Sequence, residues 1–188
     1  NIEPLINSST KAISVVHIGG WPADMAKICL IAKKYNLYVI EDCSQAHGAS
    51  INNKKVGSFG DVSTWSFCQD KIISTGGEGG MVTTNNETLY KSIWSLKDHG
   101  KSIDLIKPNE KKSYGFRWLH ENLGSNYRLT EMQSAIGRIQ LSNLTKTNFI
   151  RKRNAEILFS TLKDIDFIRI PMPPENLNHA WYKFYIFL

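Results

Sequence analysis

The chain has 188 residues, of which 41% are hydrophobic and 21% are charged, and its formal net charge is +6. This length is enough for one domain with a packed core and part of a second. No apolar run reaches the roughly 18 residues of a membrane-spanning helix, and the N-terminus lacks the pattern of a signal peptide. The three cysteines form no Cys-x-x-Cys pair, which argues against a disulfide framework or a metal site and predicts a reducing, cytoplasmic compartment.

The positive charge excess has two interpretations. A solvated surface is the simpler one, because no arginine-rich stripe or nucleic-acid motif accompanies the charge. The other is attraction of an anionic small molecule, such as a phosphate cofactor or a nucleotide sugar. We therefore expect neither a nucleic acid nor a membrane as partner. The chain does not begin with methionine, so we expect it to be cut out of a longer polypeptide.

Strand and helix patterns alternate near the N-terminus. Residues 12–18 are mostly apolar and predict a buried strand. Residues 22–36 carry apolar side chains at helical spacing, and residues 37–41 predict the next strand. This order predicts a βαβ unit with parallel strands and a right-handed crossover.

The middle of the chain continues the alternation. Residues 52–55 predict a surface turn, residues 62–67 and 81–84 predict strands, and residues 86–97 predict a helix. Residues 99–125 predict a long loop, which in a compact domain is usually functional or disordered. The aromatic residues in that loop indicate that part of it packs; they are Tyr114, Phe116 and Trp118.

A capping-box pair, Thr130 and Gln133, predicts the start of a helix. The helical pattern continues to about Leu162, with a possible kink near residues 142–143. A helix of this length often bridges two lobes. Two further strands are predicted after it, at 167–170 and 182–188.

Two residues stand where a parallel sheet places its chemistry. Asp42 closes a predicted strand, and Lys71 lies between another strand and the glycine cluster 76–80. A lysine amine near the mouth of a sheet can hold the aldehyde of pyridoxal phosphate as a Schiff base, while a carboxylate keeps the ring nitrogen protonated. A lysine held away from water is also expected to have a lowered pKa, which a nucleophilic amine needs.

Each of these residues also has a structural interpretation. Asp42 could cap a loop, and Lys71 could be solvated like most lysines. Ser66 could donate to a cofactor phosphate or simply end a strand. The glycine cluster 76–80 is not a P-loop, because no Gly-Lys-Ser/Thr follows, and it could form a tight turn between two strands.

Together, the ordered motifs resemble the DegT/DnrJ/EryC1/StrS family of pyridoxal-phosphate-dependent sugar aminotransferases. The matching segments are His17 to Gly20, Pro22 to Met25, Val39 to Ala49, Val56 to Asp61, Ser66 to Lys71, Gly77 to Gly80, Asp98 to Gly100, Leu123 to Glu131 and Ala135 to Leu141. The resemblance covers essentially the whole chain. One departure is Gln69-Asp70, where the family more often has proline and threonine, and this change is expected to affect local packing.

The resemblance implies an α/β, aspartate-aminotransferase-like fold (fold type I), with a mostly parallel sheet in the large domain, present here as an incomplete fragment. By the same match, Lys71 is the catalytic Schiff-base lysine and Asp42 is the partner of the pyridine nitrogen. Gln45 would lie close to the ring, and Ser66 would bind the phosphate. Asn126 would reach the phosphate of the neighbouring subunit, so the resemblance implies a homodimer with shared active sites.

The implied reaction moves an amino group from an amino acid, typically glutamate, to a nucleotide-linked ketosugar. Lys71 would act as general base and acid in this transfer. Such reactions serve the biosynthesis of amino-deoxysugars, cell-surface polysaccharides and antibiotic sugars. Relatives with histidine at the lysine position are dehydratases, so Lys71 favours a transaminase.

The resemblance also implies a division of the chain. Residues 1–140 would form the central and C-terminal part of the large cofactor-binding domain, 141–163 a connecting helix, and 164–188 the start of a smaller domain. Family members have further sequence on both sides, so a truncated, non-catalytic homologue with an incomplete cofactor site is the alternative hypothesis. A Schiff-base lyase without pyridoxal is a third, but it leaves Asp42 and Ser66 without a purpose.

Overall fold

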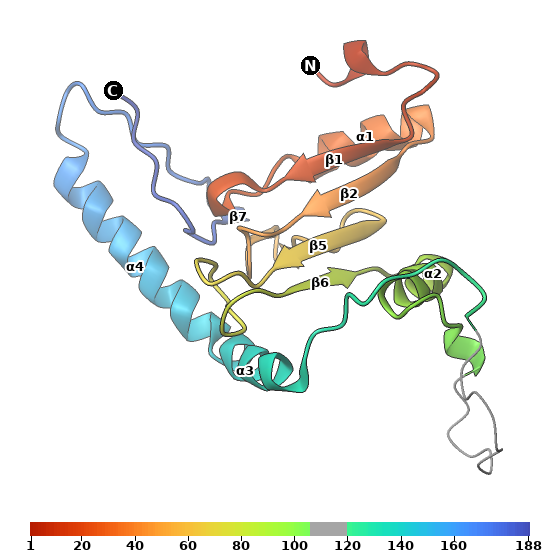
Figure 1. The fold of residues 1–188 in the computed structure, drawn as a ribbon. Helices are drawn as coiled ribbons and strands as arrows, with labels where there is room; N and C mark the ends of the chain where they lie inside the picture. The colour runs from red at the N-terminus through yellow and green to blue at the C-terminus, as the bar shows by residue number, and fades with distance from the viewer. Residues whose placement is uncertain (106–119) are drawn as a thin grey trace.

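The computed structural model describes residues 1–105 and 120–188. Its centre is a sheet with the strand order β1 (Ala12–Val16), β2 (Tyr38–Asp42), β5 (Val62–Ser66) and β6 (Gly80–Thr83). β1, β2 and β5 are parallel, and β6 runs antiparallel to β5 (Figure 1). The predicted strand positions and the parallel pairing of β1 with β2 are therefore confirmed.

Helix α1 (Met25–Tyr35) connects β1 to β2. It begins later than the predicted residue 22 because the side chain of Asp24 accepts a hydrogen bond from the Lys27 N–H and caps its first turn. It ends at Asn36, whose left-handed conformation is typical of a helix C-terminus. Its buried face packs on the sheet in one hydrophobic cluster, which includes Ile13, Val15, Met25, Ala32 and Val39.

A second, small sheet anchors the C-terminal part of the chain. β3 (Ser50–Ile51) and β4 (Lys54–Lys55) form a hairpin, and the two asparagines between them have positive φ angles of 49° and 64°. Asparagine suits such a turn because it tolerates the left-handed region. β7 (Leu177–Asn178) pairs with the other edge of β3. The predicted turn at 52–55 is thus confirmed.

The remaining helices lie toward the two ends of the sheet (Figure 1). They are α2 (Glu87–Lys97), α3 (Glu131–Ser142), α4 (Leu144–Leu162) and the short 3₁₀ segments η1 (Glu3–Leu5), η2 (Ile18–Gly20) and η3 (Ile103–Leu105). The predicted capping box of α3 is present, and Asn143 separates α3 from α4 where the kink is predicted. The carboxyl ends of β1, β2 and β5 point toward α4 and the C-terminal segment (Figure 1).

Two predictions about the later segments have different outcomes. The strands expected at 167–170 and 182–188 are wrong: only Arg169 and Phe187 pair, through two backbone hydrogen bonds of 2.9 Å. A single pair cannot propagate into a ladder when no further strand of the described chain lies alongside it. The expected packing of the aromatic residues Tyr114, Phe116 and Trp118 falls outside the described residues.

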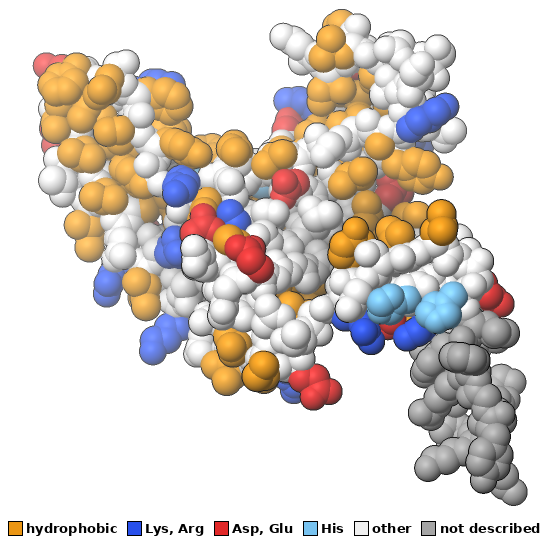
Figure 2. Space-filling model, in the orientation of Figure 1, with side chains coloured by type: hydrophobic (Ala, Val, Ile, Leu, Met, Phe, Trp, Pro, Cys, Tyr) orange, Lys and Arg blue, Asp and Glu red, His pale blue; other side chains and the backbone are white. Residues whose placement is uncertain are grey.

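Hydrophobic side chains gather on the surface over α4 and the C-terminal segment (Figure 2). The exposed ones there include Phe149, Ile157, Leu158, Phe167, Phe187 and Leu188. A cavity of about 670 Å³ opens between the sheet and helices α3 and α4, with Trp65, Phe67, Met81 and Leu144 in its wall. Among the described residues, no helix combines the length and the hydropathy needed to cross a membrane.

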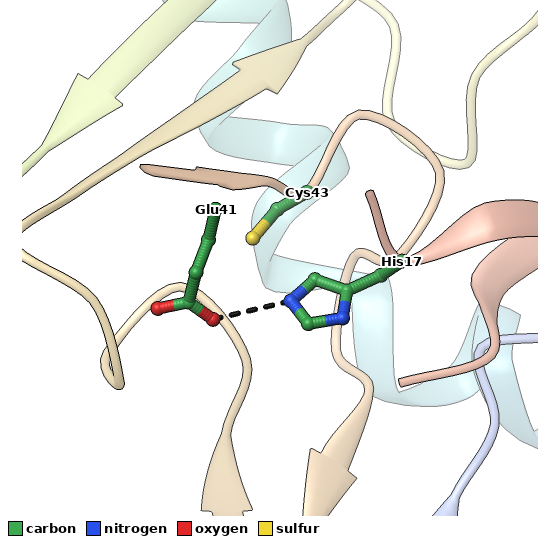
Figure 3. Close-up of side chains that lie close together, drawn as sticks. All are labelled: His17, Glu41 and Cys43. Carbon is green, nitrogen blue, oxygen red and sulfur yellow. Dashed lines mark hydrogen bonds and ion pairs between the residues drawn. The ribbon is translucent and has the colours of Figure 1, made fainter. Parts of the chain in front are cut away.

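The buried carboxylate of Glu41 connects two loops to strand β2. Its Oε1 accepts hydrogen bonds of 2.7 Å from the N–H groups of Phe59 and Gly60. Its Oε2 accepts from the N–H of Gly57 at 2.8 Å and from His17 Nε2 at 3.1 Å (Figure 3). Burial acts to raise the pKa of Glu41, but these four hydrogen bonds outweigh it, and the pKa is lowered.

The tautomer of His17 follows from its partners. Its Nδ1 accepts a hydrogen bond from the Ala23 N–H at 3.0 Å, so the ring proton is on Nε2, which donates to Glu41. His17 and Glu41 are both fully buried. The pair therefore fixes the loop after β1 and the loop before β5 relative to β2.

We predict that Glu41→Gln lowers the free energy of unfolding by about 2–4 kcal/mol, because an amide NH₂ would then face backbone N–H donors in a site without water access. Urea denaturation measures the change. Glu156→Gln is the matched control, since Glu156 is exposed on α4 and pairs loosely with Lys152 at 3.9 Å. Its effect should stay below about 0.5 kcal/mol. Equal effects of the two substitutions would contradict the role of Glu41.

Two buried histidines make the fold sensitive to acid. His47 is 2% exposed, packs against the rings of Trp65 and Phe67, and has no hydrogen-bond partner for its ring nitrogens in the described part of the chain. His179 is 5% exposed, and its Nδ1 accepts from the Trp181 N–H at 2.6 Å. Burial lowers the pKa of each imidazole to about 4. Both rings are therefore neutral at pH 7.

We predict that the free energy of unfolding falls as the pH drops from 7 to 5. The unfolded histidines take up protons near pH 6.5, whereas the folded ones resist protonation down to about pH 4. The stabilising contribution is thus complete above pH 6.5 and is lost below it, by roughly 1.4 kcal/mol per pH unit and histidine. Denaturation curves at several pH values should show a weaker dependence for His47→Leu. His120→Leu, at an exposed position, should keep the full dependence.

Candidate active site

The candidate site lies at the sheet edge where three parallel strands end. The loops that follow β1, β2 and β5 all leave the sheet there (Figure 1). Cys43, Ile72, Ala180 and Tyr182 pack together in one hydrophobic cluster. This cluster brings the neighbour of Asp42, the neighbour of Lys71 and the C-terminal segment into contact.

Lys71 is surrounded by two groups that favour its charged form. Its Nζ lies 3.5 Å from the hydroxyl oxygen of Tyr182 and 3.5 Å from Oδ1 of Asp70, and its side chain is 16% exposed. Burial acts to lower the pKa of Lys71, but Tyr182 and Asp70 together outweigh it and raise the pKa. The expectation of a lowered pKa is therefore wrong for this structure, because sequence alone does not show the acidic partners.

The departure from the family pattern at Gln69-Asp70 has a clear consequence. Tyr182 donates its hydroxyl hydrogen to Oδ2 of Asp70 at 2.7 Å, and this bond lowers the pKa of the carboxyl. Asp70 thus brings a carboxylate next to Lys71 and connects the loop after β5 to the C-terminal segment. These contacts involve the residue at which the chain departs from the family pattern.

Asp42 and Ser66 each make one local hydrogen bond and keep further capacity. Asp42 ends β2, and its Oδ1 accepts from the Ser44 N–H at 3.0 Å, so the loop-capping role is present. Within residues 1–105 and 120–188, no side-chain or backbone donor reaches its Oδ2. Ser66 ends β5, and its Oγ accepts from the Cys68 N–H at 3.3 Å. Its hydroxyl hydrogen remains able to donate to an anion.

Gln45 lies in the loop after β2, and its side chain is hydrogen-bonded to the turn that follows β1. Its Oε1 accepts from the Gly19 N–H at 2.6 Å, which leaves its side-chain N–H groups as donors. Gly20 has a φ of 95°, and a Cβ there would lie 3.0 Å from the Gln45 carbonyl oxygen and 3.0 Å from the Tyr182 nitrogen. A glycine is therefore required for the C-terminal segment to approach this turn.

The structure does not bring Asn126 to the other candidate residues within one chain. Asn126 forms a backbone bridge with Asp98, at the end of α2, and its Oδ1 accepts from Arg128 Nε at 3.0 Å. α2 follows β6, which runs away from the edge that holds Lys71 (Figure 1). An exposed residue at the far end of the sheet can serve the site of another subunit, as the resemblance implies.

His17, Glu41 and Cys43 have ligand atoms within 4.8 Å of one another, as a metal site would require (Figure 3). Both nitrogens of the His17 ring and both oxygens of Glu41 are already engaged in hydrogen bonds. Burial also raises the pKa of the Cys43 thiol, which opposes the thiolate that a metal binds. The arrangement supports the loops of the site and has no donor left for an ion.

Sequence reasoning missed Tyr182, Asp70 and the His17–Glu41 pair. Tyr182 lies in a segment predicted as a strand, far along the chain from Lys71, and no local pattern marks it. The residues it found still form a coherent donor set: an amine for an aldehyde, a carboxylate for a pyridine nitrogen, a hydroxyl for a phosphate and an amide. This set fits pyridoxal phosphate.

Comparison with known proteins gives consistent matches. The dTDP-3-amino-3,6-dideoxy-alpha-D-galactopyranose transaminase of Aneurinibacillus thermoaerophilus is 42% identical, over 99% of this chain and 49% of its own length. A crystallised aminotransferase from Psychrobacter cryohalolentis is 45% identical, with a TM-score of 0.91 over 98% of this chain and 49% of that one. The E. coli GDP-4-keto-6-deoxy-D-mannose-3-dehydratase, solved with bound hydrated PLP, is 30% identical, with a TM-score of 0.83 over 99% and 49% of the two chains.

These matches confirm the expected fold, a mixed α/β architecture with a mostly parallel sheet like that of the aminotransferase structures. The chain spans about half the length of the curated relatives it matches. The sequence profile of one family matches residues 1–188, which is every residue of the chain. The chain therefore belongs to the DegT/DnrJ/EryC1/StrS aminotransferase family.

Proposed function

We propose that this chain carries the catalytic lysine of a pyridoxal-phosphate-dependent aminotransferase acting on a nucleotide-linked ketosugar. The observation that carries the proposal is Lys71, which lies in the loop after β5, at the same carboxyl edge of the sheet where Asp42 ends β2 and Ser66 ends β5. An amino acid, typically glutamate, would donate the amino group.

The residues divide the work by their chemistry. When bound, pyridoxal phosphate supplies an electron sink for negative charge at the carbon beside the transferred nitrogen. Lys71 would hold the cofactor aldehyde and would also move protons as general base and acid. Asp42 would keep the ring nitrogen protonated, and Ser66 would donate to the phosphate. Gln45 would lie beside the ring, with its orientation set by the hydrogen bond from Gly19.

The nature of the substrate is supported by two features. The A. thermoaerophilus relative is named for a dTDP-linked amino sugar, and this chain has a net charge of +6, which suits an anionic nucleotide sugar. The product class would be amino-deoxysugars for cell-surface polysaccharides or antibiotics. The three cysteines are free, which fits a cytoplasmic enzyme.

We propose a division of the chain into domains that draws on two observations. α4 covers 144–162 and so accounts for most of the proposed connecting helix 141–163. The segment 164–188 contacts the large-domain part through β7 and through Tyr182. We propose that residues 1–140 belong to the large domain and that 164–188 begin a smaller one.

We predict that Lys71 is the site of cofactor attachment. Incubation with pyridoxal phosphate, reduction with borohydride and peptide mapping should place the label on the peptide that contains Lys71. Lys71→Ala should abolish the label and lower transaminase activity by at least about 1,000-fold. Lys163→Ala, at an exposed lysine, should change neither. Persistence of the reducible label in Lys71→Ala would refute the assignment.

A non-catalytic homologue is the second candidate, and specific observations favour it. β1 and β6 are the outer strands of the described sheet, and Val16, Met81 and Val82 on them are about half exposed. The cavity of about 670 Å³ beside β5 and β6 is open as well. In this case the same labelling experiment should give no modified peptide from the wild-type chain, although the chain remains folded.

Asn126 gives a test of the proposed homodimer. If each site uses Lys71 of one subunit and Asn126 of the other, then Lys71→Ala and Asn126→Ala are both inactive as homodimers. A mixture of the two should recover about a quarter of wild-type activity, since half of the dimers are mixed and each has one intact site. Activity should be measured before and after mixing and re-equilibration. Failure of the mixture to regain activity would contradict shared sites.

A further inference from the structure

Tyr182 bridges Lys71 and Asp70. Its hydroxyl oxygen lies 2.7 Å from Oδ2 of Asp70 and 3.5 Å from Nζ of Lys71. The ammonium also lies 5.2 Å from the centre of the Tyr182 ring, within the range of a cation–π contact. One side chain of the C-terminal segment thus contacts both Asp70 and Lys71 of the loop after β5.

The C-terminal segment is fastened on both sides of Tyr182. The Ala180 N–H donates to the Gly20 carbonyl oxygen, and the Lys183 N–H donates to the Gly19 carbonyl oxygen, both at 2.9 Å. These bonds hold the segment against the turn that follows β1. The same turn binds the side chain of Gln45, so Tyr182 and Gln45 share one backbone support.

The residue before Tyr182 adopts an unusual conformation that other elements stabilise. Trp181 has a φ of 53°, which is uncommon for a bulky residue. Its carbonyl oxygen accepts from Arg151 Nη1 on α4 at 3.1 Å, and its N–H donates to His179 Nδ1 at 2.6 Å. The rings of Trp181 and His179 stack with centres 4.3 Å apart. These contacts of Trp181 fix the backbone conformation next to Tyr182 and so orient the Tyr182 side chain.

We propose that Tyr182 is a positioning residue that, together with Asp70, holds the free ammonium group of Lys71 and so couples the docking of the C-terminal segment to the catalytic lysine. The purpose assigned to this contact rests on the proposed function. A lysine that must leave a cofactor and then move protons needs a defined resting place, and the Asp70–Tyr182 pair provides one.

Asp70 and Tyr182 are the ionisable groups that act on Lys71, and Lys183 and His47 are charged or titratable groups nearby. Asp70 is on the same loop, Tyr182 comes from the C-terminal segment, and Lys183 lies over the Tyr182 ring at 4.8 Å. His47 is buried and neutral at pH 7. Burial acts to lower the pKa of Lys71, while Tyr182 and Asp70 raise it. Removing either partner should therefore make the amine more easily deprotonated and more reactive.

The test measures Lys71 without any cofactor. The protein is treated with acetic anhydride at pH 8, and the acetylation of each lysine is determined by mass spectrometry. Tyr182→Phe keeps the ring and removes the hydroxyl, and Asp70→Asn removes the charge at a half-exposed position. Each should increase acetylation of Lys71 by roughly threefold or more, whereas Lys163 in the same digest stays constant as an internal reference.

Matched controls separate positioning from general packing. Tyr185→Phe removes a hydroxyl from the same segment, and Asp166→Asn removes a charge at an exposed position. Both should leave Lys71 acetylation unchanged. Wild-type reactivity of Lys71 in Tyr182→Phe and in Asp70→Asn would overturn the proposal, as would an equal increase in Tyr185→Phe.

The acetylation and labelling experiments together distinguish a failure of the Tyr182 proposal from a failure of the proposed function. Borohydride labelling of Lys71 in the wild type, combined with unchanged acetylation in Tyr182→Phe, would overturn the role of Tyr182 and leave the enzyme assignment intact. Increased acetylation in Tyr182→Phe, without cofactor labelling of the wild type, would support the contact and refute the enzyme assignment.

Discussion

The buried carboxylate of Glu41 is the constraint on which the site depends. It sits one residue before Asp42 and accepts four hydrogen bonds from groups in two other loops. An ionised carboxylate is costly to bury unless its oxygens are satisfied, so these loops have little freedom to move independently. Glu41 thus fixes the backbone from which Asp42 extends, and through His17 it fixes the turn after β1.

The turn after β1 also fixes the position of the C-terminal segment. Gly19 and Gly20 accept backbone hydrogen bonds from the C-terminal segment, and the segment places Tyr182 against Lys71. The candidate site is therefore assembled from strand ends close in sequence and from a segment far away. The C-terminal segment therefore contacts the lysine directly through Tyr182.

The described surface has features that the proposed homodimer would use. Exposed hydrophobic side chains lie over α4 and the C-terminal segment, and an open cavity lies beside β5 and β6. Exposed hydrophobic patches often contact another polypeptide. Asn126 lies far from Lys71 on the same chain, which is the arrangement expected when two subunits complete each other's sites.

The sequence by itself determined the local elements and the main chemical groups. Apolar periodicity predicted the sheet strands and helices, the Thr130–Gln133 pair predicted the start of α3, and strand-end positions singled out Asp42, Ser66 and Lys71, because these signals act over a few neighbouring residues. Only the tertiary structure decided that 167–170 and 182–188 form no strands, that Glu41 joins His17, and that Tyr182 and Asp70 raise the pKa of Lys71. The contacts of His17 with Glu41 and of Tyr182 with Lys71 join segments far apart in the sequence, and no local pattern encodes them.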